Sequence, residues 1–278
     1  MKQYIFLPVA LVATLAMLLL SSCTITTGSQ NDIVDQGEII KETRKLDTFS
    51  SIIASGSKDI EFIISDSSYI EIEAGKNILP HIKTEVNNGQ LIIQLDKVGG
   101  QPFYSKETKT FHFQTSNSIL SDAQIKIKVF GPSLEEIFTS GSINFVADSL
   151  STTEEFKIHT AGKADIDIKH VACNNSRIEI AGNSNVKIGN LTCQNLRIET
   201  AGKGDVKLNV NGADNTDINV AGKSDADITF NNCNRAGIHV AGLANITLRG
   251  KLNILDKHIA GHCTLDTDEL KLTNKNEE

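Results

Sequence analysis

The dipeptide Ala-Gly recurs at one spacing through the second half of this chain. Five copies stand 20 residues apart, a sixth follows after 19 residues, and Ser140-Gly141 precedes the first copy at a distance of 21 residues. The copies are Ala161-Gly162, Ala181-Gly182, Ala201-Gly202, Ala221-Gly222, Ala241-Gly242 and Ala260-Gly261. A fixed period near 20 residues is typical of a solenoid, in which each repeat is one coil that stacks on its neighbours.

Apolar and polar residues alternate on both sides of each Ala-Gly pair, as in residues 177–188 and 197–208. Because a period of two marks a strand with one buried face, each unit is predicted to hold two short strands. The glycine supplies the backbone freedom for the bend between them. The expected inward columns are Ile178/Ile198/Ile218/Ile238, with Ile158 a better first member than Phe156, then Ile166/Val186/Val206/Ala226/Ile246 and Ile168/Ile188/Leu208/Ile228/Leu248. The chain is therefore predicted to be an all-β solenoid of stacked parallel coils, without amphipathic helices.

A column of acidic and amide residues stands three positions after each glycine. Its members are Asp165, Asn185, Asp205, Asp225 and Asn245, and Lys163, Asn183, Lys203 and Lys223 stand one position after the glycine. We interpret the column mainly as turn chemistry, in which Asp and Asn bond their own backbone. The functional alternative is a carboxylate ladder for calcium binding or glycan hydrolysis, which needs two carboxylates placed about 5–9 Å apart.

The other strand of each coil carries a second set of outward charges. Its columns are His159/Glu179/Glu199/Asn219/His239 and Lys157/Arg177/Arg197/Asp217. We predict a solvated wall of cross-strand charge pairs, which also discourages pairing between exposed edges.

Besides Cys23, the chain has four cysteines. Cys173, Cys193 and Cys233 share one corner column with Ala213, and Cys263 follows later. We favour buried free thiols that act as small apolar residues, since parallel side chains suit disulfide geometry poorly; a Cys173–Cys193 bridge stays open. His258, His262 and Cys263 match no metal-binding motif, so neither a metal nor another cofactor is predicted.

The first 23 residues have the form of an export signal. A short basic start and the apolar run Ile5–Leu20 are followed by Leu20-Ser21-Ser22-Cys23. These features are typical of a secretory signal peptide. The last four residues resemble the bacterial lipobox, in which the cysteine is acylated and becomes the first mature residue. The resemblance implies lipidation of Cys23 and membrane anchoring, and an uncleaved anchor helix is the alternative.

The rest of the chain divides by regularity. We predict a signal peptide at 1–22, a flexible tether at 23–43 and a single solenoid domain at 44–275. Within that domain 44–130 is irregular and strand-rich, 131–250 holds the regular coils and 251–275 forms a C-terminal cap. Residues 99–122 are polar and contain Gly99-Gly100-Gln101-Pro102, which predicts an excursion from the coils. An open end above the last coil would need this cap or a second subunit, so homo-oligomerisation is also considered.

Two segments before the repeats carry a family resemblance. They have the patterns R-x-L-x-x-F-x-x-I-x-x-x-G, from Arg44 to Gly56, and P-x-L-x-x-I-x-x-S-G, from Pro132 to Gly141. Together with the repeats of a small residue plus glycine, they make residues 44–270 similar to the putative auto-transporter adhesin head GIN domain family. The resemblance implies a right-handed parallel β-helix and an adhesive role in exported bacterial proteins, without any catalytic residue to transfer. The predicted acylated tether departs from a true autotransporter.

Composition narrows the function further. The formal net charge is −7, so the chain lacks the basic surface of a nucleic-acid-binding protein. Trp, whose ring is a usual platform for sugars and for protein interfaces, is absent. We predict a non-enzymatic outer-membrane lipoprotein, at the periplasmic face or the cell surface, that binds a glycan or protein partner or acts as a scaffold. No ligand-binding residue is assigned. The alternative is a β-helical polysaccharide hydrolase or lyase, which fold alone does not license.

Overall fold

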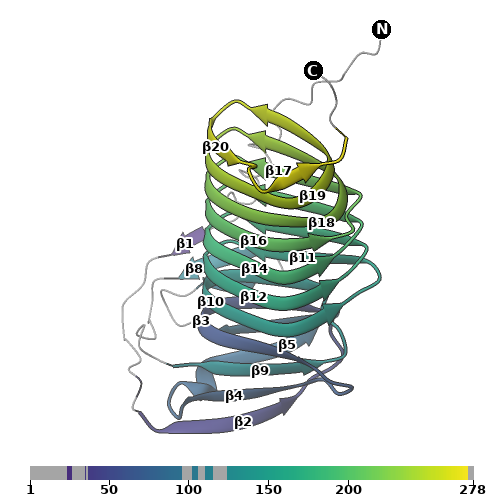
Figure 1. Cartoon of the computed structure of the whole chain (residues 1–278). Helices are drawn as coiled ribbons and strands as arrows, with labels where there is room; N and C mark the ends of the chain where they lie inside the picture. The colour runs from purple at the N-terminus through teal and green to yellow at the C-terminus, as the bar shows by residue number, and fades with distance from the viewer. Residues whose placement is uncertain are drawn as a thin grey trace.

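The protein is a stack of β-coils (Figure 1). The computed structural model describes residues 24–26, 35, 37–95, 102–105, 110–114 and 124–274. Within these residues the only helical element is the 3-10 turn η1 (Leu79–His81), and no helix is long and apolar enough to cross a membrane. The prediction of an all-β solenoid with coils of about 20 residues is confirmed.

Each regular coil contains a short and a long strand that meet at the Ala-Gly corner. The short strands are β11 (Glu155–Thr160), β13 (Asn175–Ile180), β15 (Asn195–Thr200) and β17 (Asn215–Val220). The long strands are β12 (Lys163–Ala172), β14 (Asn183–Thr192) and β16 (Lys203–Asn211), and β10 (Glu136–Ser151), β18 (Lys223–Val240) and β19 (Leu243–Ile259) each continue through a corner. Neighbouring coils pair in parallel, so each side chain stands above its equivalent one coil earlier.

The strand register confirms all three predicted inward columns. Ile158 pairs with Ile178 in a column that continues upward to Ile238 and downward to Ile137 and Ile52, while Phe156 pairs with Ser176. The columns that start at Ile166 and Ile168 also follow the predicted residues up to β19. Each buried aliphatic side chain contributes about 1.5–3 kcal/mol. The three columns together form one continuous apolar core along the stack, which no single coil could form alone.

The Ala-Gly corners bring backbones of successive coils into direct contact. Ala181 N–H donates to the Thr160 carbonyl at 2.9 Å, and the same bond recurs one coil later from Ala201 to Ile180 at 2.8 Å. A β-carbon added to Gly182 would overlap the carbonyl oxygen of Gly162. Gly182 is not among the glycines with a positive φ, so the close stacking of the coils, and not the predicted bend, requires glycine at this corner.

The N-terminal part mixes parallel and antiparallel pairs at the lower end of the stack in Figure 1. Its strands are β2 (Ile39–Lys45), β3 (Ser51–Ile64), β4 (Tyr69–Gly75), β5 (Ile82–Asn87), β6 (Gln90–Leu95) and β9 (Lys126–Gly131). A turn at Asn88-Gly89 joins β5 to β6, with Asn88 and Gly89 at φ 49° and 75°. Strand β2 pairs antiparallel with β4 from Ile39 onward, so the paired strands extend to the N-terminal side of residue 44. The apolar pair Ile39-Ile40 already belongs to this edge strand.

A separate three-stranded sheet lies beside the stack. It consists of β1 (Thr24–Thr26), β8 (Thr110–Gln114) and β7 (Pro102–Ser105), in that spatial order. The predicted excursion at 99–122 therefore contains a hairpin, and the predicted tether at 23–43 contains two paired segments, β1 and the start of β2. The predicted signal peptide at 1–22 and Cys23 lie outside the described residues.

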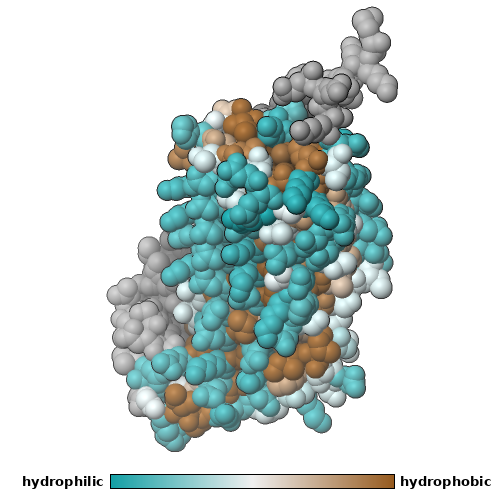
Figure 2. Space-filling model, viewed as in Figure 1, coloured by the Kyte–Doolittle hydropathy of each residue, from teal (hydrophilic) through white to brown (hydrophobic). Residues whose placement is uncertain are grey.

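The last coil differs from those below it. It consists of the second half of β19, then β20 (His262–Asp266) and β21 (Leu270–Leu272), so the predicted cap region 251–275 forms strands up to Leu272. Here Lys257 takes the place above Ile238 in an inward column, and Ile259 is 44 % exposed. Figure 2 shows apolar residues at this upper end. The charge of Lys257 in this inward column disfavours the stacking of a further coil on this end.

Candidate functional site

A ladder of acidic and amide side chains runs along one outer face of the solenoid. The register places Asp59, Asn144, Asp165, Asn185, Asp205, Asp225 and Asn245 in one column. We call these seven residues the polar ladder. All seven are exposed, because side chains alternate along a strand and their neighbours in sequence fill the core.

The ladder residues bond to one another across the coils. Asn185 Nδ2 donates to Asp165 Oδ1 at 2.6 Å, and Asn245 Nδ2 donates to Asp225 Oδ1 at 2.7 Å. These residues lie inside strands β12 to β19, so our interpretation of the column as turn chemistry is wrong. Backbone hydrogen bonds hold the Ala-Gly corner, so the ladder side chains are free to bond to one another across the coils.

Basic residues flank the ladder on both sides. On the corner side, Lys163, Asn183, Lys203 and Lys223 form one column, as predicted. On the other side, Lys187 Nζ pairs with Asp167 Oδ2 at 2.8 Å and Lys207 Nζ with Asp227 Oδ2 at 3.5 Å. These pairs are exposed, so each contributes at most about 1 kcal/mol to stability. The face therefore presents carboxylates, amides and ammonium groups side by side.

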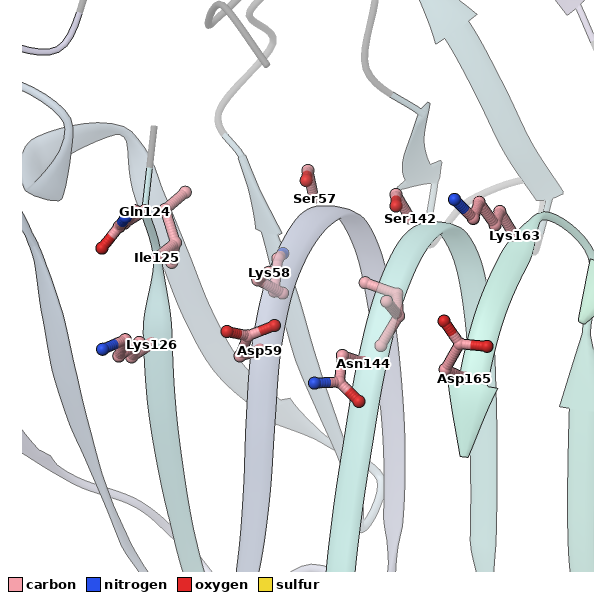
Figure 3. A pocket seen from close by; sticks show the side chains of 11 residues that line it. Ser57, Lys58, Asp59, Gln124, Ile125, Lys126, Ser142, Asn144, Lys163 and Asp165 are labelled. Carbon is pink, nitrogen blue, oxygen red and sulfur yellow. The ribbon is translucent and has the colours of Figure 1, made fainter. Parts of the chain in front are cut away.

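Two shallow hollows lie along the ladder. The upper hollow has a volume of about 530 Å³ and runs from Asn185 past Asp205 and Asp225 to Asn245. The lower hollow has a volume of about 540 Å³, and Figure 3 shows Asp59, Asn144 and Asp165 on neighbouring strands at its edge, with Lys126 beside them. Both hollows are open, which suits an extended ligand; the lining of the lower one is mainly polar and that of the upper one mainly apolar.

The lower hollow contains a buried lysine. Lys58 is 4 % exposed and takes an inward position in β3, where later coils have Ile143 and Ala164. Its ammonium donates to the carbonyl oxygens of Ser55 and, at 3.2 Å, Ile93. Burial lowers the pKa of Lys58 to about 7. These carbonyls belong to the paired strands β3 and β6, so Lys58 satisfies backbone acceptors near the end of β6.

The second outer face carries an interlocked charge cluster around His159. Its Nδ1 lies 2.7 Å from Glu179 Oε2, and its Nε2 lies 3.4 Å from Glu136 Oε1. Arg177 reaches both Glu179 and Glu199, the latter at 3.3 Å. We call these five residues the His159 cluster. The side chains of Glu179 and Glu199 are only 15 % exposed, so the predicted solvated wall is wrong at this point. Stacked neighbours in adjacent columns cover them.

Contacts within the His159 cluster shift the pKa values of His159 and Glu179. Burial alone would lower the pKa of His159, but hydrogen bonds and charge from Glu136 and Glu179 outweigh burial and raise the pKa to about 9. Burial alone would raise the pKa of Glu179, but His159 and Arg177 lower it to about 2. The cluster is therefore ionised on both sides at neutral pH, and its members satisfy one another.

The four described cysteines are free thiols in a mostly apolar setting. Cys193 and Cys233 are buried, and Cys173 and Cys263 are half-buried. Burial raises the pKa of Cys173 to about 11 and that of Cys193 to about 12, so both thiols are weak nucleophiles at neutral pH. No Cys173–Cys193 bridge is present.

The described residues contain no group of three or more His, Cys, Asp or Glu that could hold a metal ion. Of the residues weighed for a metal, His258 stacks on His239 at 5.1 Å between ring centroids, His262 is exposed and Cys263 is half-buried.

The sequence interpretation missed the lower rungs of the polar ladder. Asp59 and Asn144 stand three residues after Gly56 and Gly141, the same offset as in the later rungs. This signal was present, but the two glycines lie outside the 20-residue period. Lys58 was missed because a lysine between the polar residues Ser57 and Asp59 is normally taken as outward-facing.

One family matches most of the chain. It is described as "Putative auto-transporter adhesin, head GIN domain" and matches residues 48–251. A comparison with curated proteins finds no match to the sequence.

Several solved structures share the fold. A putative adhesin from Bacteroides fragilis has a TM-score of 0.65 at 20 % identity and covers 84 % of this chain and 99 % of its own. A putative adhesin from Parabacteroides distasonis has a TM-score of 0.61 at 16 % identity, covering 87 % and 98 %. A putative lipid binding protein from the same species has a TM-score of 0.59 at 18 % identity, covering 84 % and 97 %. At these identities the similarity establishes the fold.

Proposed function

Since this chain belongs to the putative auto-transporter adhesin, head GIN domain family, we propose that it is a lipid-anchored, adhesin-like binding module of the cell envelope. In this proposal acylated Cys23 holds the protein on the outer membrane, and the solenoid binds a glycan or protein partner without chemical conversion. Family membership and the adhesin names of its structural neighbours support the binding role. The signal peptide and the lipobox-like residues support the anchor.

The polar ladder is the observation that carries the binding role. Seven exposed Asp and Asn side chains repeat at one coil spacing along β3 to β19, and both hollows follow them. A carboxylate has about four acceptor sites and an amide has both donors and acceptors, so the pairwise bonds leave most of this capacity unused. A repeating, unsaturated row of hydrogen-bonding groups suits a polymeric ligand that lies along the stack.

The binding role is preferred over hydrolysis because of how the face is built. Adjacent ladder carboxylates such as Asp205 and Asp225 are exposed and stand at a repeated spacing, without a closed cleft around any one pair. Catalytic carboxylates differ in environment, so that one is protonated while the other is ionised. The ladder repeats one environment many times.

Binding of purified protein to a glycan panel tests this proposal. Residues 24–278 are immobilised and exposed to defined neutral and acidic polysaccharides, with a reducing-end assay in parallel. The variant Asp165→Ala/Asp205→Ala/Asp225→Ala should lose most binding to any polysaccharide that the unmodified chain retains. The matched control Glu154→Ala/Gln194→Ala/Asp214→Ala changes exposed residues at the opposite corner and should bind normally.

Three outcomes would count against the proposal. Equal loss in both variants would place the binding elsewhere. New reducing ends that disappear in the ladder variant would replace the binding role with the hydrolase alternative. Retention of no polysaccharide, together with no protein captured from envelope extracts, would remove the support for the ladder as a binding face.

A further inference from the structure

The small sheet beside the stack contains the segment that directly follows the predicted acylation site. Thr24, Ile25 and Thr26 pair in parallel with His112, Phe113 and Gln114 of β8. Because Thr24 is joined to Cys23 by one peptide bond, this pairing fixes the start of the mature chain against β8. Any lipid on Cys23 would therefore be attached next to this sheet, and not at the end of the flexible tether predicted at 23–43.

The same sheet holds an unusual share of the aromatic residues. The chain has 11 Phe, 3 Tyr and no Trp, and four of these 14 aromatic residues are in the β7–β8 hairpin. In the register Tyr104 stands opposite Phe111, Phe103 opposite His112 and Pro102 opposite Phe113. No comparable aromatic cluster occurs elsewhere in the sequence.

The other described aromatic residues are explained by the solenoid. Five phenylalanines are buried in its core: Phe49, Phe62, Phe145, Phe156 and Phe230. Tyr69 stacks on Phe130 at 4.1 Å, and Phe138 stacks on His159 at 5.8 Å. The hairpin belongs instead to a sheet separate from the eighteen-stranded sheet of the coils.

The small sheet lies on one side of the solenoid stack. Strand β7 lies close to β3 and β6, and Figure 1 shows β1 and β8 at the side of the stack, away from both of its ends. A membrane held at this sheet would therefore meet the side of the solenoid.

We propose that the β1–β8–β7 sheet is a membrane-contacting element that rests on the phospholipid bilayer beside the acyl chains of Cys23. This inference rests on the proposed lipid anchor and adds the surface that the anchor places on the membrane. Aromatic residues are enriched at the membrane–water interface, where a ring is held between the acyl chains and the head groups. Each acyl CH₂ that is buried contributes about 0.8 kcal/mol, and an apolar contact at the same point adds to this attachment.

Charge favours an apolar contact over an electrostatic one. The chain carries a formal net charge of −7, which opposes attraction to anionic lipids. The contact should therefore form on zwitterionic vesicles and persist in high salt, because salt screens charge pairs without weakening apolar burial.

The absence of Trp from the sequence allows a direct test. The full mature, acylated chain is reconstituted in phosphatidylcholine vesicles that carry bromine on their acyl chains, which quenches Trp on contact. The variant Phe111→Trp places one Trp in the hairpin, and the control Gln194→Trp places one at an exposed position on the opposite corner. Phe111→Trp should lose most of its fluorescence in brominated vesicles relative to unbrominated ones, at low and at high salt, whereas Gln194→Trp should keep it.

The outcomes separate this inference from the anchor. Mass spectrometry of the N-terminal peptide reports acylation of Cys23 independently of quenching. An acylated chain with equal fluorescence of Phe111→Trp in both vesicles would overturn the membrane contact and leave the anchor intact. An unacylated chain that is still quenched would overturn the anchor and support the contact. Circular dichroism of both variants verifies the fold, and Tyr104→Trp, opposite Phe111 in the register, provides a second reporter.

Discussion

The two outer faces of the same coils carry charge in different ways. The face of β12, β14 and β16 exposes the polar ladder, whose bonds join neighbours in pairs. The face of β11, β13 and β15 carries the His159 cluster, in which His159 contacts two carboxylates and Arg177 joins Glu179 to Glu199. Both faces have the same backbone and spacing. The difference lies in how far the charged groups satisfy one another: those of the His159 cluster bond mainly to one another, whereas those of the polar ladder keep unused hydrogen-bonding capacity.

The corner between the two faces is expected to show the largest mutational effect. Gly182→Ala should destabilise the protein by about 3 kcal/mol, because the added carbon overlaps the Gly162 carbonyl in the coil below. Thermal or urea unfolding measures this loss. Ala201→Ser changes an exposed residue at the next corner and should be nearly neutral. Equal stability of Gly182→Ala and the unmodified protein would contradict the close stacking of the corners.

The His159 cluster is expected to show the next largest effect. Glu179→Gln removes the charge that binds both His159 and Arg177, and it should cost about 2 kcal/mol at pH 6.5, as for hydrogen bonds to charged groups. Urea unfolding of the variant and the unmodified protein measures the difference. A neutral result would show that the second face is as weakly coupled as the polar ladder.

The same cluster predicts a pH dependence. The pKa of His159 is raised from 6.5 to about 9 by folding, so its contribution is complete below pH 6.5 and is lost as pH rises through 9. The stability difference between the unmodified protein and His159→Gln should shrink over this range. Lys58 acts in the opposite direction, since its pKa falls from 10.5 to about 7, but it is present in both proteins and cancels. A difference that stays constant from pH 6 to pH 9.5 would contradict the raised pKa.

The polar ladder is expected to show the smallest effect on stability. Asp205→Ala should change the free energy of unfolding by less than about 0.5 kcal/mol, because the residue is exposed. The same urea titration measures it. A loss comparable to that of Glu179→Gln would make the ladder a structural element and remove the contrast between the faces.

Much of the fold follows from local sequence rules. The Ala-Gly period predicts the corners, and alternation predicts which residues enter the three inward columns, as Ile158 and Ile166 show. The N-terminal part was less predictable because antiparallel pairs occur in it beside parallel ones, without a fixed period. Sequence spacing also cannot reveal that Lys58 faces inward and donates to backbone carbonyls of β3 and β6.

The candidate site was predictable in position but not in environment. The offset of three residues after each glycine locates the polar ladder, and it would also have found Asp59 and Asn144. The alternation of apolar and polar residues predicts that Glu179 faces outward. It does not predict that side chains of neighbouring columns cover Glu179, so that only 15 % of its side chain is exposed. The degree of burial on an outer face depends on side chains from adjacent coils, which a pattern along one strand does not contain.

Labelling of the polar ladder on living cells tests the central claim most directly. In Asp205→Cys a new thiol stands on the exposed ladder, while the native thiols are buried or half-buried and have raised pKa values. A membrane-impermeant maleimide should label Asp205→Cys on intact cells as fully as in lysed cells, if the solenoid presents this face to external partners. Labelling that appears only after lysis would contradict an adhesin-like role at the cell surface.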